Sequence, residues 1–419
     1  MENVKLLKNK QYVYLISSQI VSSIGDWLDL LALMALVSIN WKASPMEMTY
    51  LMLCLVLPSI LFGSFAGVAA DKVDRKKIMI FTDIMRAAVV ALVVFAPNLW
   101  TVYLLIFMKS SFSALFMPAK NGKLKEIVSD EHMQQAVSIS SMIDNGSKII
   151  GPMVSGVVVS SFGVHPAFYI DAATFVLSAV LLLNIKKSTN LKNDADSGEK
   201  KNFLVEMKAG FSFLKSVPEV LAGLVVMSLS LLVLQIADSQ FMILLREIPG
   251  IPIDLAGYAM SASGGGMFVM AAILSKKPIK SARWFLSLGA IGVGGGFAVC
   301  VLFTGFPILF IKIVYPVLFF IVGIAAASIF IPFNVLAQKS APVHMSGRVF
   351  GTINSVTSSA AVIGMLLGGI LVEAAGIKAA FILSGSMLVL IGLASAWVKP
   401  ASGGSVTVAE SERGIQREA

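Results

Sequence analysis

Residues 306–336 read FPILFIKIVYPVLFFIVGIAAASIFIPFNVL, and Lys312 is the only charged side chain in this stretch. About 20 apolar residues span the hydrocarbon core of a bilayer as a helix, so this stretch is long enough to cross a membrane. The whole chain of 419 residues has the same character: 57% of its residues are hydrophobic and 14% are charged. A soluble domain carries about 25% charged residues, so the composition excludes an ordinary soluble enzyme and indicates a polytopic helical membrane protein.

Eleven further stretches along the chain resemble this one in length and apolar character, and each is predicted to form one membrane-spanning helix. Tight polar turns separate several of them, such as the turn at Pro97 and Asn98. The sequence therefore predicts an all-α polytopic membrane protein with 12 transmembrane helices. The predicted spans are residues 12–39, 47–70, 78–97, 99–118, 133–162, 166–185, 219–245, 254–275, 284–304, 306–336, 346–374 and 378–398.

The positively charged residues lie almost entirely on one side of this predicted topology. Of the 33 lysines and arginines, 26 fall in the two terminal segments and the even-numbered loops, three in the opposite loops and four inside predicted helices. Because loops rich in lysine and arginine stay in the cytoplasm, we expect both termini to be cytoplasmic and the protein to lie in the cell (inner or plasma) membrane. The net charge of +9 then reflects membrane topology, and we expect no nucleic-acid partner.

A polar segment in the middle of the chain separates six predicted spans from the next six. Apolar residues at helical spacing follow this segment and predict an amphipathic helix on the membrane surface. These residues are Phe203, Leu204, Met207, Phe211 and Leu214. The expected units are an N-terminal six-helix bundle at 1–185, a cytoplasmic linker with the amphipathic helix at 186–218, a C-terminal six-helix bundle at 219–400, and a disordered cytoplasmic tail at 401–419.

The two halves also share residues at an offset of 213 positions. The matched pairs are Gly151 with Gly364, Gly156 with Gly369, Gly163 with Gly376 and Phe168 with Phe381, and with one insertion Pro118 with Pro332. Parallel repeats of this kind are typical of transporters in which the substrate binds between the halves near the midplane. We therefore expect two pseudo-symmetric six-helix bundles.

The loop after the second predicted span reads Gly67-Val-Ala-Ala-Asp71-Lys-Val-Asp74-Arg75-Lys76-Lys77. It resembles the signature loop of the major facilitator superfamily, in which a glycine is followed four residues later by an acid and then by a basic cluster. From this resemblance we expect Gly67, Asp71, Asp74, Arg75 and Lys76 to act in conformational gating. Three further segments are similar to the macrolide-efflux branch, so that the resemblance covers nearly the whole chain. They are the segments at 203–211, 347–350 and 117–119.

The resemblance implies a secondary active transporter: a proton-coupled exporter of amphipathic small molecules, drug-like or macrolide-like, that works by alternating access. Its partners would be a small-molecule substrate, protons and the lipid bilayer, and it would act as a monomer. A siderophore exporter and a lysophospholipid carrier of the same superfamily stay open as alternatives, as does a non-transporting membrane receptor. The sequence contains no Walker A motif, no catalytic triad and no paired metal-ligand spacing, so we expect no cofactor, no metal and no enzyme activity.

Ionisable residues occur inside the predicted spans although each costs roughly 2.5–3.5 kcal/mol at the bilayer centre, so each is a functional candidate. Asp83 with Arg86, and Asp144 with Lys148, have the spacing of intrahelical ion pairs. The remaining intramembrane charges include Asp171 and Lys312, which are expected near the outer membrane interface. In this superfamily helices one, four, seven and ten line the central cavity. The resemblance therefore places four charged residues there: Asp26, Asp29, Lys109 and Asp238.

Asp26 and Asp29 share one helical face. Two acids this close cannot both ionise cheaply in a low dielectric, so at least one is expected to bind a proton. Lys109 stands where proton-coupled drug antiporters of the superfamily often carry an arginine, and it would modulate that proton. The helix-five motif of those exporters survives in part, as Gly151, Pro152 and Gly156, and is expected to support close helix packing. Four apolar residues are candidates for the cavity lining: Phe112, Phe116, Met242 and Phe333.

Overall fold

The computed structural model of the protein describes residues 6, 8–187, 211–248, 250, 253–276, 281–342 and 345–397. These residues form helices and connecting turns, and no strand occurs among them. The first six long helices are α2 (Lys10–Ala35), α3 (Pro45–Lys72), α4 (Arg75–Val93), α5 (Leu99–Ile127), α6 (Asp130–Phe162) and α7 (Val164–Leu183). The later ones are α9 (Pro218–Asp238), α11 (Ile253–Lys276), α12 (Ala282–Leu302), α13 (Ile308–Ser340), α14 (Ser346–Ala375) and α15 (Ile377–Trp397). Three short elements lie between them: η1 (Leu36–Asn40), α10 (Phe241–Arg246) and η2 (Phe303–Gly305).

Ten segments among the described residues are long and apolar enough to cross a membrane. The helices α4 and α6 are not among these ten. Both carry several charged side chains, including the pair Asp83 and Arg86 on α4 and the residues Asp144 and Lys148 on α6. With ten segments of this kind, the chain is a multi-pass membrane protein.

Side-chain caps fix where several helices begin. At the start of α3 the backbone N–H of Ser44 donates to the Glu47 carboxylate (2.7 Å) and the N–H of Glu47 donates to the Ser44 hydroxyl (3.3 Å), a reciprocal capping box. Asp74 accepts a hydrogen bond from the N–H of Lys76 (3.0 Å) and so begins α4, and Asn98 accepts one from the N–H of Thr101 (3.0 Å) and so begins α5. These caps place the turns close to where the sequence pattern predicted them.

Three predicted boundaries differ from the observed ones. The span predicted at 219–245 is interrupted after Asp238, and the short helix α10 follows a two-residue turn. The helix predicted to end at residue 118 continues through Pro118 to Ile127, and α13 likewise runs to Ser340. The expected amphipathic helix falls mostly outside the described residues, which include only its last turns from Phe211 to Ser216 as helix. The linker from residue 188 and the tail also lie outside them.

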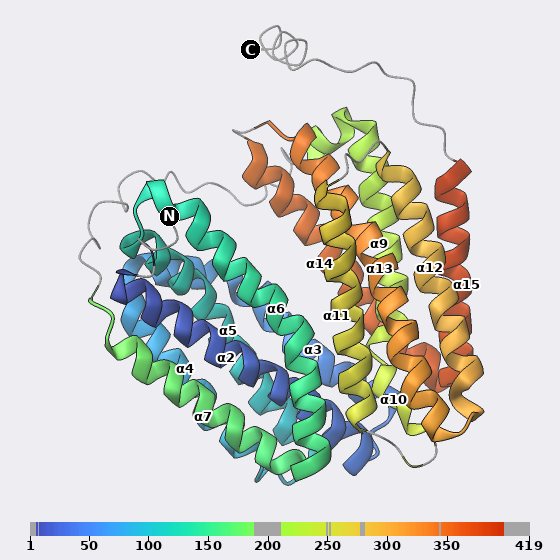
Figure 1. The fold of residues 1–419 in the computed structure, drawn as a ribbon, viewed down its shortest axis with the longest axis horizontal. Helices are drawn as coiled ribbons and strands as arrows, with labels where there is room; N and C mark the ends of the chain where they lie inside the picture. The colour runs from blue at the N-terminus through green and yellow to red at the C-terminus, as the bar shows by residue number, and fades with distance from the viewer. Residues whose placement is uncertain are drawn as a thin grey trace, which may run out of the picture.

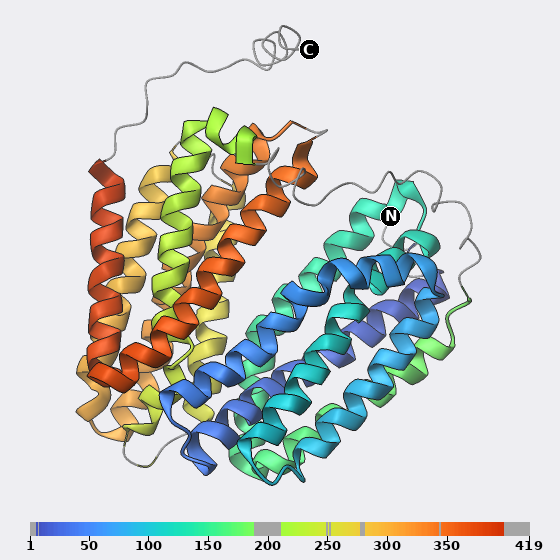
Figure 2. The same ribbon diagram turned by 180° about the vertical axis from the view of Figure 1, so that it is seen from behind.

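Figure 1 shows the helices α2–α7 gathered on one side of the molecule and α9–α15 on the other. The two groups approach each other at the end where α10 lies and diverge toward the opposite end, and the view from behind agrees (Figure 2). The described chain begins and ends at this divergent side, because both the start of α2 and the end of α15 lie there.

The positions matched by the 213-residue offset occupy corresponding places in the two groups. Gly163 (φ 89°) joins α6 to α7, and Gly376 (φ 82°) joins α14 to α15, so both turns use a left-handed backbone that favours glycine. Phe168 and Phe381 are both buried beside these turns. The internal repeat seen in the sequence is thus also a repeat of local structure.

The two groups meet through closely packed small residues. A Cβ on Gly156 of α6 would lie only 2.9 Å from the Cα of Gly257 on α11. In the matched place on the other side, Gly369 of α14 lies against Met46 and Thr49 at the start of α3. Glycine at these positions lets the helix backbones approach closely.

We predict that Gly156→Ala lowers the stability of the protein, because the added methyl group meets the backbone of α11, which cannot rotate away. Overpacking of this kind costs about 1–3 kcal/mol. The measurement is the apparent melting temperature of purified protein in detergent. Gly146→Ala on the same helix is the matched control, since a Cβ there meets no atom within 4 Å, and it should leave the melting temperature unchanged or slightly raised. Equal melting temperatures for the two variants would contradict the packing assignment.

Candidate functional site

Lys109 of α5 is shared by two acids of α2. Its Nζ atom lies 2.9 Å from Oδ1 of Asp26 and 2.7 Å from Oδ2 of Asp29. The Lys109 and Asp29 side chains are almost completely buried, whereas 42% of the Asp26 side chain is exposed. Lys109 therefore ties α2 to α5, and of its two acids only Asp26 retains contact with the exterior.

The sequence analysis missed a third acid of this cluster. Asp171 of α7, expected at the outer interface, is fully buried and lies close enough to interact electrostatically with Lys109, Asp29 and Asp26. Its Oδ1 atom accepts a hydrogen bond from the Thr174 hydroxyl (3.1 Å). Three acids thus surround one lysine. The only signal in the sequence was Gly25 on α2, which leaves the space that the Asp171 carboxyl occupies.

The expected ion pair between Asp83 and Arg86 is present on α4, and both side chains are buried. Asp83 also accepts a hydrogen bond from the Ser178 hydroxyl of α7 (2.7 Å). The Arg86 guanidinium lies over the rings of Phe116 (4.5 Å) and Phe175 (4.3 Å), which is the geometry of cation–π contacts. This pair joins α4 to α5 and α7 next to the Lys109 cluster.

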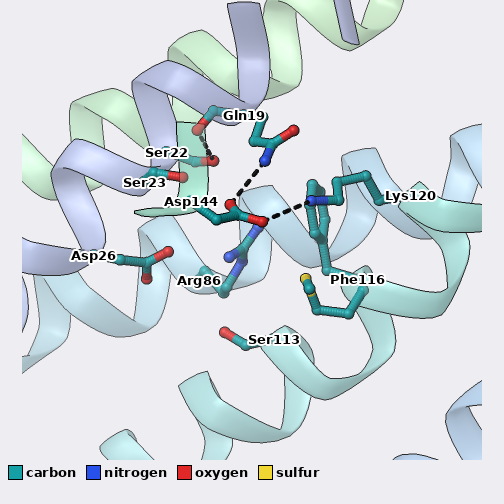
Figure 3. A pocket seen from close by; sticks show the side chains of 10 residues that line it. Gln19, Ser22, Ser23, Asp26, Arg86, Ser113, Phe116, Lys120 and Asp144 are labelled. Carbon is teal, nitrogen blue, oxygen red and sulfur yellow. Dashed lines mark hydrogen bonds and ion pairs between the residues drawn. The ribbon is translucent and has the colours of Figure 1, made fainter. Parts of the chain in front are cut away.

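A cavity of about 210 Å³ lies beside the cluster, and side chains from α2, α4, α5 and α6 line it. Figure 3 shows Asp26 at one side of this cavity, Asp144 and Arg86 near its middle, and Phe116 and Lys120 at the other side. Drug-sized ligands occupy pockets of about 300–1,000 Å³. In this conformation the cavity suits water or a small polar group, and Asp26 is among the residues that line it.

The predicted ion pair between Asp144 and Lys148 is wrong. Asp144 instead accepts a hydrogen bond from the Gln19 side chain (2.7 Å) and lies 4.0 Å from the Lys120 amine, so it pairs across to α2 and α5 (Figure 3). Lys148 is exposed and donates to the Asn145 side chain (3.3 Å). The difference arises because Asp144 lines the cavity together with Gln19 and Lys120, whereas Lys148 is exposed.

The remaining predicted site residues are dispersed. Asp238 is exposed at the end of α9, and no described residue forms a hydrogen bond or ion pair with it. Of the four apolar candidates, Phe116 lines the cavity beside Asp26, and Phe112 lines a second, apolar cavity of about 400 Å³ between α3 and α5. Met242 and Phe333 are buried in the hydrophobic core and line neither cavity. Lys312, expected near the interface, pairs with Asp254 of α11 (3.1 Å).

The loop between α3 and α4 binds neighbouring helix ends. Arg75 contacts Glu126 at the end of α5 (2.7 Å) and the Ala70 carbonyl (3.2 Å), and Lys76 donates to the Leu183 carbonyl at the end of α7 (2.7 Å). Gly67 lies in α3, and a Cβ added there would meet no atom within 4 Å; the Asp71 side chain lies outside the described residues. The loop therefore fastens α4 to the ends of α5 and α7.

The motif on α6 faces other helices. Gly151 packs against the Trp27 side chain of α2, and the Pro152 carbonyl lies against Gly257 of α11, beside Gly156. The three motif residues thus lie where α6 touches both α2 and the other group of helices.

Residues 15–365 match the model of the Major Facilitator Superfamily. The chain belongs to this superfamily. It is 42% identical over 393 residues, 94% of each chain, to an uncharacterized MFS-type transporter, YfiS, of Bacillus subtilis. It is 26% identical to macrolide efflux protein A of Streptococcus pyogenes, over 80% of this chain and 83% of that protein. The crystal structure of a nucleoside transporter, NupG, shares the fold with a TM-score of 0.73 at 16% identity, covering 92% of this chain and 98% of that one.

We predict that Lys109→Met lowers the free energy of unfolding by about 3–5 kcal/mol, because removing one partner leaves a buried charge uncompensated. The double variant Lys109→Met/Asp29→Asn should recover most of this loss, since the buried charge is removed as well. Denaturant unfolding in detergent measures both. The control is Lys312→Met, which breaks the pair with Asp254. Because the Lys312 side chain is 41% exposed, this variant should lower the free energy of unfolding by only about 0–1 kcal/mol. A double variant as unstable as the single one would show that Asp29 does not depend on Lys109.

Proposed function

We propose that the protein is a secondary active, proton-coupled exporter of amphipathic small molecules that works by alternating access. The observation that carries this proposal is the Lys109 cluster, in which one lysine serves two acids of α2. If both acids are ionised the cluster carries excess negative charge in a low dielectric, which proton binding relieves. Such a site would bind or release a proton when alternating access changes its exposure to water.

Asp26 is the acid that meets the exterior in this arrangement. Its carboxylate is 42% exposed and borders the cavity of about 210 Å³, whereas Asp29 has no such access. A cavity of this size has room for several waters. Water in the cavity would deliver and remove protons at Asp26, and Lys109 would pass the change in charge to Asp29.

Alternating access is supported by the contacts between the two groups of helices. At the α10 end, Gln240 donates to Thr49 (2.9 Å) and Arg246 donates to the carbonyls of Ser38 (3.1 Å) and Ala43 (2.9 Å). These few polar contacts could break together when the two groups of helices separate at this end. We infer twelve membrane-spanning helices in two pseudo-symmetric bundles, with both chain ends cytoplasmic, so that this conformation is closed to the outside.

The substrate class rests on similarity and on surface chemistry. A relative named for macrolide efflux shares 26% identity over most of both chains. The apolar cavity between α3 and α5, of about 400 Å³, falls in the size range of drug-sized pockets and is lined by phenylalanines, including Phe62, Phe65 and Phe112. An amphipathic molecule would place its apolar part against such a lining. All residues of the charged cluster come from one chain, so a monomer suffices.

We predict that neutralising the acid that carries the coupling proton, by Asp26→Asn or Asp29→Asn, abolishes export driven by a pH gradient but spares downhill exchange of the substrate. Exchange requires alternating access without net proton movement, so it should survive the loss of the proton site. The measurement is transport of a macrolide in membrane vesicles with and without an imposed pH gradient. Asp254→Asn, which removes a carboxylate outside the cluster, should retain gradient-driven export. Full gradient-driven export in both Asp26→Asn and Asp29→Asn would place the coupling site elsewhere.

A further inference from the structure

Asp171 is a buried carboxyl group that the proposed mechanism does not use. The residue is 0% exposed, and its Oδ2 atom has no hydrogen-bond partner among the described residues. Its other oxygen accepts only the Thr174 hydroxyl, a neutral donor from its own helix (3.1 Å). An ionised carboxylate buried in this way would be poorly stabilised, since buried charges require pairing and hydrogen bonds.

The fold places this carboxyl group directly against α2. A Cβ on Gly25 would overlap both Asp171 Oδ1 and Thr174 Oγ1, so the carboxyl lies on the backbone of α2 where a side chain is missing. Gly25 and Asp29 are four residues apart and therefore share a helix face, one turn from each other. A second buried oxygen without a partner, Asp29 Oδ1, belongs to that neighbouring acid.

The surrounding charges leave Asp171 without a cation of its own. Lys109 donates hydrogen bonds to Asp26 and Asp29, and Arg86 pairs with Asp83. The helices packed on α7 are α2, α4 and α6. Their charged residues nearest to the cluster are Asp26, Asp29, Asp83, Arg86, Asp144 and Lys148. Asp144 binds Gln19 and Lys148 is exposed, so neither supplies charge to Asp171. On α7 itself, His165 and Tyr169 are exposed.

We propose that Asp171 binds a proton in the conformation of this structure and is a second proton-binding residue of the Lys109 cluster. The proton sits on the carboxyl group as an O–H and removes one negative charge from a set of three acids and one lysine. This deepens the proposed function and rests on it for its role in transport, because the cluster is the proposed coupling site.

The position of Asp171 gives it a role in proton exchange that differs from the role of Asp26. It lies seven residues into α7, about 10 Å from the helix start at the α10 end of the molecule, whereas Asp26 lines the cavity. When Asp26 takes a proton from the cavity, Lys109 keeps its positive charge but loses one of its anions. The field at Asp171 then favours the ionised form, so proton binding at Asp26 and at Asp171 oppose each other.

The test is infrared spectroscopy of the purified protein in lipid nanodiscs at neutral pH, without substrate and without a gradient. The wild-type protein should show the carbonyl stretching band of a protonated carboxylic acid, and this band should be lost in Asp171→Asn. Asp171→Glu should keep the band at a shifted frequency, which covers the case in which the asparagine variant fails to fold. Asp254→Asn, at a site outside the cluster, should leave the band unchanged.

Three results would overturn the inference: no such band in the wild-type protein, a band that persists unshifted in both Asp171 variants, or a band that disappears on addition of sodium, which would make this a sodium site. Because the spectra need neither substrate nor transport, the two proposals can fail separately. Gradient-driven export with an ionised Asp171 would refute this inference alone. A protonated Asp171 in a protein that exports no substrate against a gradient would refute the proposed function alone.

Discussion

The sharing of Lys109 between Asp26 and Asp29 is the interaction on which the N-terminal helices depend. A lysine amine buried in a membrane protein is stable only when acids compensate it, and here the acids come from a different helix. The requirement fixes how α2 and α5 face each other, because 2.7–2.9 Å contacts allow little sliding or rotation. A separate contact holds α7 against α2, because the buried Asp171 lies in the space left by Gly25. In this part of the fold, the buried charged side chains therefore determine how the helices pack.

The contact between the two groups of helices is of a different kind. It is built from glycines and single hydrogen bonds, as at Gly156 with Gly257 and at Gln240 with Thr49. Contacts of this sort pack well and yet can separate without exposing a large buried charge. The charged cluster lies within one group of helices. The hydrogen bonds described between the two groups include a charged donor at Arg246.

Much of this arrangement could be predicted from the sequence. The lengths of the apolar stretches predicted the long helices, and the capping residues Ser44, Asp74 and Asn98 lie close to the predicted helix starts. The proximity of Asp26, Asp29 and Lys109 followed from a shared helix face together with the family's helix arrangement. The sequence misassigned Asp144, because spacing along one helix says nothing about a cavity that opens on its other side. It also misplaced Asp171, because depth counted from a helix end cannot reveal that a glycine on another helix leaves room for a carboxyl group.

Proton-coupled export, as proposed, requires the Lys109 cluster to give up a proton when substrate binds. This can be measured as the release of protons from the detergent-purified protein into weakly buffered solution when a macrolide is added. We expect binding to release protons from the wild-type protein, and the release to be lost or reduced in Asp26→Asn and Asp29→Asn, although both still bind. Binding of the macrolide to the wild-type protein without any proton release would show that the cluster is not coupled to the substrate.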